Sequence, residues 1–123
     1  MSSATNVVPE RADRLPYIFL LRMVLQIIQK ETGSSFQLSQ LNLLLTIMDE
    51  DGISYPDLMS RTELPASTVS RNVKELFKRK LVEIIVDPMD TRCHAARLTQ
   101  KGDSLKREIQ GILQGSFTGI PKR

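Results

Sequence analysis

Hydroxyl and cationic side chains recur between residues 67 and 78 of the chain, at spacings that suit one side of a helix. They are Ser67, Thr68, Ser70, Arg71, Lys74 and Lys78. At about 100° per residue, Ser67 and the three cations lie between about 140° and 200° from Val69, opposite an apolar face. Hydroxyl and guanidinium groups hydrogen-bond to base edges, and ammonium groups pair with phosphates. The chemistry that this pattern favours is non-covalent recognition of an anionic partner.

The single cysteine and the single histidine of the chain stand side by side, as Cys93 and His94. Two adjacent ligands cannot close a tetrahedral metal site alone, and one histidine excludes HExxH and three-histidine sites. The sequence also lacks the phosphate-binding, dinucleotide-binding and nucleophile motifs GxxxxGKS/T, GxGxxG and GxSxG. We therefore expect no metal, no cofactor and no enzymatic activity, and we interpret Cys93 as an unreactive side chain.

Size and composition predict one globular domain. The chain has 123 residues and 13.9 kDa, and its contents of 41% hydrophobic and 25% charged residues are average for globular proteins. The longest uninterrupted apolar run, Tyr17 to Leu21, is too short to span a bilayer, and the first ten residues lack a signal-peptide pattern. These features predict a cytoplasmic protein without a membrane partner.

The charges are unevenly distributed along the chain. Residues 61–107 contain eleven Lys and Arg against six Asp and Glu, a net charge of +5, whereas the whole chain carries +3. The stretch from Asp49 to Asp57 contains four carboxylates and no cation. A basic half of this kind is typical of a protein that binds a polyanion, most often nucleic acid. On charge alone, a solvated helix face explains the pattern equally well.

The apolar periodicity predicts a scaffold that begins with two helices. The first runs from Leu15 to Lys30 and is apolar over so wide an arc that it must be buried on more than one side. In a domain this small we expect the second side to face a partner subunit, and a central core helix of a monomer is the alternative. The second helix is capped by Ser39 and ends before Gly52, and Ile53 forms one short extended step. The two stripes of the first helix are Ile18, Leu21, Leu25 and Ile28, and Leu20, Val24 and Ile27.

A short helix, a brief break and a longer helix come next. Ser54, with Asp57 three residues later, caps a helix from Tyr55 to Arg61. Pro65 begins the longer helix, which ends near Lys80. Its expected core face consists of Val69, Val73, Leu76 and Phe77.

The remainder of the chain predicts a hairpin and a last helix. Residues Leu81–Asp87 are rich in β-branched side chains and predict a strand, 88–91 form a turn, and His94–Leu98 form the return strand. Thr99 then caps a helix that ends at Gly115.

This order of elements predicts a mainly α fold with a small β-hairpin, which is a winged helix-turn-helix. We expect residues 1–13 to form a flexible arm and 115–123 a loose tail. Residues 14–114 then form the winged helix-turn-helix domain, with dimerisation helices at both of its ends.

The motif residues resemble the MarR-type winged-helix transcription regulators. The resemblance rests on Ser67-Thr68-Val69-Ser70-Arg71 and on the basic stretch from Leu76 to Val82. It also rests on Asp90-Thr91-Arg92, which is followed, after five intervening residues, by Leu98-Thr99-Gln100-Lys101-Gly102. It implies a homodimeric DNA-binding regulator. It also implies that Asp90 orients Arg92 at the wing tip through an ion pair.

Three residues depart from the pattern of that family. Glu63 and Lys80 stand where the family usually has glycine, and Pro65 stands where its recognition helix usually has a polar cap. The family also usually has a further C-terminal helix that completes the dimer, which the sequence up to Arg123 does not predict. A small-molecule effector pocket between the dimerisation and DNA-binding parts is implied by the resemblance, but no residue of the sequence supports one.

Physical arguments assign the expected contacts. The N-terminal turns of a recognition helix reach base edges in the major groove, and Arg71 can bind guanine O6 and N7 through two parallel hydrogen bonds. The hydroxyls of residues 67, 68 and 70 lie in the same turns. Lys74 and Lys78 lie further along the helix, where phosphates are the expected partners. Arg92 is expected in a minor groove, where the negative potential is enhanced over A·T-rich sequence.

Together these features predict a sequence-specific regulator of transcription that binds double-stranded DNA. We expect, most simply, a repressor that acts as a homodimer on a palindromic operator. The alternative is a winged-helix protein-interaction or assembly module that binds no specific sequence. The cation-rich outer face of the recognition helix favours DNA, whereas an apolar outer face would favour the module.

Overall fold

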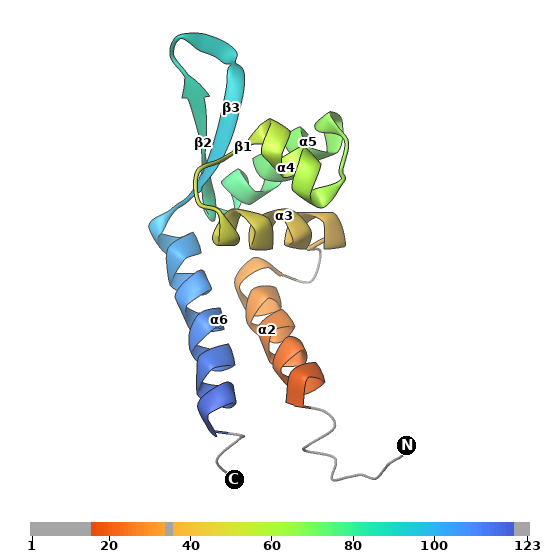
Figure 1. Cartoon of the computed structure of the whole chain (residues 1–123), viewed down its shortest axis with the longest axis vertical. Coiled ribbons are helices and arrows are strands. Elements are labelled where there is room, and N and C mark those ends of the chain that lie inside the picture. The colour runs from red at the N-terminus through yellow and green to blue at the C-terminus, as the bar shows by residue number, and fades with distance from the viewer. Residues whose placement is uncertain (1–15, 34–35, 120–123) are drawn as a thin grey trace. The chain divides into compact units, whose positions relative to one another are not determined.

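The computed structural model of the chain describes residues 16–33 and 36–119. In chain order, the elements are α2 (Pro16–Thr32), α3 (Leu38–Asp49), β1 (Ile53–Ser54), α4 (Tyr55–Thr62), α5 (Ala66–Lys78), β2 (Val82–Asp87), β3 (Asp90–Leu98) and α6 (Gln100–Gly119) (Figure 1). Contacts divide them into two compact units, one within residues 34–107 and one formed by the described parts of 1–33 and 108–123. None of the helices in these described ranges has both the length and the apolar character that crossing a membrane requires. The expected flexible arm, residues 1–13, lies outside the described residues.

Helix α2 buries one narrow stripe of side chains. Leu20, Val24 and Ile28 are at most 7% exposed. Thr32 continues the stripe, and its hydroxyl donates to the carbonyl of Ile28 at 2.6 Å. The helix therefore ends two residues later than expected, before Gly33, which has a φ of 89°. In the single chain, the stripe that begins at residue 18 is exposed except for its last member, Ile28, and the buried arc follows every fourth residue from Leu20.

The start of α3 differs from the expectation that Ser39 caps it. The residue before the helix is Gln37, which is extended at φ −86° and ψ 156° and donates its amide to Oε1 of Gln40 at 3.4 Å. Ser39 already lies within the first turn, where a side chain cannot act as the cap. Its hydroxyl instead accepts a hydrogen bond of 3.1 Å from Nδ2 of Asn72, which is 1% exposed.

The core of the unit formed by residues 34–107 lies where α3, α4 and α5 meet the base of the sheet. Apolar side chains from all four elements are fully buried because each element turns one face inward. They include Leu43, Leu44, Ile47, Leu58, Val69, Val73, Leu76 and Ala96. This core fixes the orientation of α5 about its own axis, and hence which of its side chains face outward.

The sheet has three antiparallel strands in the order β1-β3-β2, so the hairpin is joined by the short step that Ile53 was expected to form. The hairpin register pairs Val82 with Leu98 and continues to Asp87 and Asp90. Pairing thus extends the return strand further back than the expected start at His94. Figure 1 shows the hairpin of β2 and β3 projecting beside α4 and α5.

Helix α6 begins as expected but continues beyond its expected end. The hydroxyl of Thr99 accepts the amide of Gly102 at 3.0 Å and donates to the carbonyl of Lys80 at 2.6 Å. The expected end at Gly115 is wrong, because the helix runs to Gly119. Glycine lowers the stability of a helix interior by about 1 kcal/mol but ends a helix only where it turns left-handed, which Gly115 does not. Residues 115–119 are therefore not a loose tail, and 120–123 lie outside the described residues.

Candidate nucleic-acid interface

Helices α4 and α5 form the helix-turn-helix, and their connection passes through Glu63. The α4 cap is the expected one, because the hydroxyl of Ser54 accepts the amide of Asp57 at 3.2 Å. Glu63 ends α4 in the left-handed region, at φ 59° and ψ 30°, and donates its amide to the carbonyl of Met59 at 2.8 Å. This conformation costs a residue other than glycine about 1–2 kcal/mol. The tight turn therefore forms despite the absence of glycine.

Lys80, two residues after the end of α5, is also in the left-handed region. It has a φ of 65°, and its amide donates to the carbonyl of Phe77 at 2.9 Å. The amide of the next residue, Leu81, reaches back to the carbonyl of Leu76 at 3.1 Å. These two bonds close the helix and direct the chain into β2. The two positions where the sequence departs from family glycines are thus the two non-glycine residues of the described chain that have a positive φ.

Helix α5 turns a polar face outward and an apolar face inward. Ser67, Ser70, Arg71, Lys74 and Lys78 are exposed, and Thr68 is half-buried.

Phe77 was expected in the core, and this prediction is wrong, since the residue is 50% exposed. The buried arc runs from Asn72 through Val69 to Val73, which places Phe77 about 90° from its centre. Asn72 lies in the buried arc instead, because its side-chain amide donates a hydrogen bond to the hydroxyl of Ser39.

The cations of α5 differ in their local partners. Lys78 forms an exposed pair with Glu75 at 3.4 Å, one turn before it. Within residues 16–33 and 36–119, no carboxylate forms an ion pair with Arg71 or Lys74. The charges of these two side chains are therefore not offset by a neighbouring carboxylate on this face.

Other cations of the basic half are used within the fold. Arg61 on α4 pairs with Asp49 at 2.6 Å and Glu50 at 3.1 Å. The acidic stretch of residues 49–57 contains no Lys or Arg, and Arg61 supplies the positive charge beside it. Arg97 pairs with Glu83 across the hairpin at 2.7 Å. The positive charges of Arg61 and Arg97 are thus offset by carboxylates within the fold, unlike those of Arg71 and Lys74 on α5.

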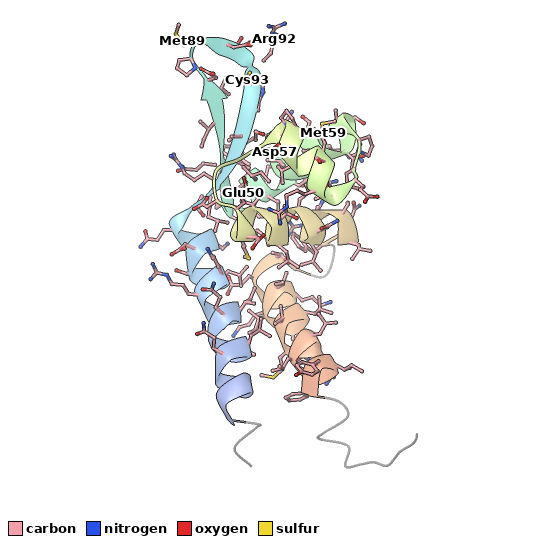
Figure 2. The ribbon with its side chains drawn as sticks, viewed as in Figure 1. Glu50, Asp57, Met59, Met89, Arg92 and Cys93 are labelled. Carbon is pink, nitrogen blue, oxygen red and sulfur yellow. The ribbon has the colours of Figure 1, made fainter. Side chains whose placement is uncertain are left out.

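The wing carries Arg92 in a defined orientation. Its Nε and its backbone amide each donate to Oδ1 of Asp90 at 3.1 Å, and Nη2 lies 3.4 Å from Oδ2. The ion pair that the resemblance implied is therefore present. These bonds from Arg92 hold the pKa of the Asp90 carboxyl below its ordinary value. The Arg92 side chain is 89% exposed, and Figure 2 shows it at the tip of the hairpin, on the other side of the tip from Met89.

Cys93 contacts the same carboxylate. The thiol hydrogen-bonds to Asp90, and this bond, together with the negative charge of Asp90, raises the pKa of the thiol. A raised pKa lowers the fraction of thiolate, which is the reactive form. Within the part of the chain that the structure describes, no group of three or more His, Cys, Asp or Glu side chains could hold a metal ion.

A hollow of about 370 Å³ lies between α4, the first turns of α5 and β3. Its wall includes Ser70 and Arg92, which were expected in the interface, and Tyr55 and His94, which were not. The rings of Tyr55 and His94 lie 5.3 Å apart between centroids and are inclined by 31°. Sequence reasoning missed this pair because the two residues are far apart in the chain, and only the pairing of β1 with β3 brings them together.

Comparison with protein families finds a match to the MarR family over residues 34–92, which extend from before α3 to the wing tip. Among curated proteins, the chain is 31% identical over 106 residues to the uncharacterized HTH-type transcriptional regulator YdgJ of Bacillus subtilis. That alignment covers 78% of this chain and 65% of the relative, so the chain spans just under two thirds of the relative's length.

Solved structures share the fold. BpsR of Bordetella bronchiseptica, whose DNA binding is regulated by 6-hydroxynicotinic acid, is 26% identical with a TM-score of 0.57, over 89% of this chain and 86% of its own. Reduced AbfR bound to DNA is 20% identical with a TM-score of 0.59, over 85% of this chain and 75% of its own. At the latter identity the likeness concerns the fold alone.

Proposed function

We propose that the chain is a member of the MarR family, which it matches over residues 34–92, and that it is a transcriptional regulator that binds double-stranded DNA at specific sequences. The observation that carries the proposal is the outward face of α5, with Arg71 and Lys74 unpaired among the described residues. The wing arginine of the same unit is exposed and held by Asp90. A helix with hydroxyl and cationic side chains fits a major groove, and an exposed arginine on a narrow hairpin fits a minor groove.

Each polar side chain of the α5 outer face and of the wing tip is assigned a DNA contact or a positioning role. Arg71 reads a guanine edge, and the side chains of Ser67, Thr68 and Ser70 approach neighbouring bases or phosphates from the same turns. Lys74 and Lys78 neutralise phosphates further along the helix. Arg92 enters the adjacent minor groove, and Asp90 keeps its guanidinium extended in the orientation described above.

We further propose that the protein acts as a homodimer. The support is a second, exposed apolar face on α2, formed by large side chains that are between 36% and 66% exposed in the single chain. They are Tyr17, Ile18, Leu21 and Leu25, which lie within about 100° of one another around the helix. Contiguous apolar surface on a helix marks an interface more often than free solvent-facing surface. A two-fold dimer presents two recognition helices to two half-sites, which predicts a palindromic operator.

Repression is the simplest outcome of such binding, because a dimer on an operator that overlaps a promoter excludes the polymerase. Repression by DNA binding involves no chemical step, as expected for a chain whose curated relative is a transcriptional regulator. A cytoplasmic location also stays a prediction. The alternative, a protein-interaction module, is less favoured because the outer face of α5 is mainly polar and cationic.

Selection of bound fragments from random double-stranded DNA tests the proposal. The expected result is one enriched motif with two-fold symmetry, whose half-sites are separated by about one helical turn. Recovery of fragments without any common motif, at a salt concentration where the protein still binds DNA, would favour non-specific binding and contradict the proposal.

A further inference from the structure

The hollow between α4, α5 and β3 lies between the two elements assigned to DNA grooves. One of its walls is the start of the recognition helix, with Ala66, Val69 and Ser70, and the opposite wall is β3, with Arg92 and His94. In Figure 2 the labelled side chain of Met59, which also lines the hollow, comes from α4, and Arg92 comes from the hairpin. All these residues belong to the unit of residues 34–107, so their relative positions are defined.

The geometry of B-DNA determines what faces such a position. A major groove about 12 Å wide and a minor groove about 6 Å wide are separated by one sugar–phosphate strand. When a helix lies in the major groove and a wing lies in the neighbouring minor groove, that strand must run between them. The surface between helix and wing is therefore the surface that the strand crosses.

Resting on the proposed function, we propose that this hollow holds one sugar–phosphate unit of the operator strand and that Tyr55 and His94 are DNA-contact residues. Its wall is mostly apolar, through Pro56, Met59 and Val69, which suits the face of a deoxyribose. Besides Arg92, its polar lining groups are hydroxyls, the Cys93 thiol and the His94 imidazole, and none of the lining residues is acidic. This arrangement is complementary to a phosphate with an apolar sugar beside it.

The imidazole of His94 is oriented for this contact. Its Nδ1 lies 3.3 Å from the carbonyl oxygen of Arg92. A carbonyl can only accept, so Nδ1 carries the proton, and Nε2 is the atom left to meet a phosphate, either directly in the protonated ring or through a bridging water. The Tyr55 ring packs against the imidazole and limits its rotation. Partial burial raises the pKa of the Tyr55 hydroxyl, so this group stays protonated and can donate at neutral pH.

Two substitutions test the proposal by different physical routes. His94→Phe keeps an aromatic ring against Tyr55 and removes both ring nitrogens. Ala66→Leu fills the hollow from an exposed position at the start of α5, where leucine is a good helix former. Arg97→Gln is the matched control, because Arg97 lies on the same strand, pairs with Glu83 and does not line the hollow. Thermal unfolding of each full-length variant verifies that the fold is kept.

The measurement is the affinity for the selected operator and for a duplex with scrambled half-sites. His94→Phe and Ala66→Leu are each expected to weaken binding about tenfold on both duplexes, because phosphate contacts carry no sequence information. Arg97→Gln is expected to change neither affinity by more than about twofold.

A neutral methylphosphonate placed at each phosphate in turn locates the contact. At one position per half-site, between the two grooves, the methylphosphonate is expected to weaken DNA binding by the wild type. It is expected to have little further effect on DNA binding by His94→Phe, because that substitution has already removed the contact to this phosphate. If His94→Phe and Ala66→Leu both bind DNA with wild-type affinity, the proposal that the hollow holds the sugar–phosphate strand is overturned. A free small apolar molecule is then the candidate occupant of the hollow. A wild type that binds no specific sequence would instead overturn the proposed function itself.

Discussion

Gly102 in the first turn of α6 lies against the carbonyl oxygen of Leu81, so close that a Cβ on Gly102 would overlap that oxygen. The same carbonyl accepts the amide of Thr99 at 3.1 Å, and the Thr99 hydroxyl caps the helix through the amide of Gly102. The motif Leu-Thr-x-x-Gly is thus one physical unit, in which threonine begins the helix and glycine allows it to approach the start of β2. It fixes the base of the wing to the last helix.

We expect Gly102→Ala to lower the free energy of unfolding by about 1–3 kcal/mol, because the added methyl group forces the backbone at Leu81 or at Gly102 to shift. Urea denaturation measures the change. Gly111→Ala is the matched control in the same helix, since nothing lies within 4 Å of its added Cβ. The control is expected to raise stability by up to about 1 kcal/mol. Equal effects of the two substitutions would show that the close approach to Leu81 is relaxed in solution.

Glu63→Gly is expected to stabilise the protein by about 0.5–1 kcal/mol. The left-handed conformation at φ 59° costs glutamate about 1–2 kcal/mol, and glycine removes this cost but loses more freedom on folding. Glu63→Ala keeps a Cβ and therefore is expected to give no gain. Chemical denaturation of the three proteins measures the difference. A stability of Glu63→Gly below that of Glu63→Ala would contradict the left-handed turn.

Arg71 and Arg92 are expected to recognise different features of the operator. Arg71→Ala should cost about 1–3 kcal/mol and relax discrimination at one base pair per half-site. Arg92→Ala should weaken binding to operators with A·T-rich flanks while leaving the central base preferences intact. Binding measured on A·T-rich and G·C-rich flanks at one salt concentration separates the two effects.

Asp90→Ala is the control for the orientation of Arg92, because it removes the bonds of 3.1 Å that hold the guanidinium without removing the cation. It should resemble a milder Arg92→Ala. If Arg92→Ala binds both kinds of flank as the wild type does, the wing is not a DNA contact.

Binding is expected to depend steeply on salt. Neutralisation of about six phosphates per dimer predicts a slope of about −5 for log K against log salt. Lys74→Gln should reduce the magnitude of that slope by about 2, one for each protomer. Arg97→Gln, whose charge is paired with Glu83, should leave it unchanged. A slope near zero for the wild type would favour the protein-interaction module.

The exposed apolar face of α2 is expected to hold two protomers together. Light scattering at micromolar concentration should give twice the chain mass of 13.9 kDa. Leu21→Glu, at a position that is 58% exposed in the single chain, should shift the mass toward that of one chain because it buries a charge in the interface. Gln26→Glu adds the same charge at another exposed position of α2 and should leave the dimer intact. A wild-type monomer would contradict the assembly.

Much of the candidate interface follows from local rules that the sequence contains. Helical periodicity alone places Arg71 and Lys74 opposite Val69, and burial of Val69 confirms which face is inward. The Ser54 cap depends on residues within one turn of each other, so its sequence signal is strong. The left-handed turn at Glu63 has no such signal, because the sequence has no glycine there. Phe77 shows the limit of such reasoning, because it lies at the edge of the apolar arc, where the neighbouring elements decide what is covered.

What only the tertiary structure decided are the contacts between residues far apart in the chain. The amide of Leu98 donates to Asp51 at 2.8 Å, and this bond, with the pairing of β1 and β3, brings the start of α4 beside the wing. The hollow and the Tyr55–His94 pair exist only as a result of that pairing. The sequence by itself determined which side chains each helix and strand presents, because those follow from the fixed geometry of the backbone. Which of these faces meet was decided by packing, since it depends on how complete elements bury their apolar surfaces against one another.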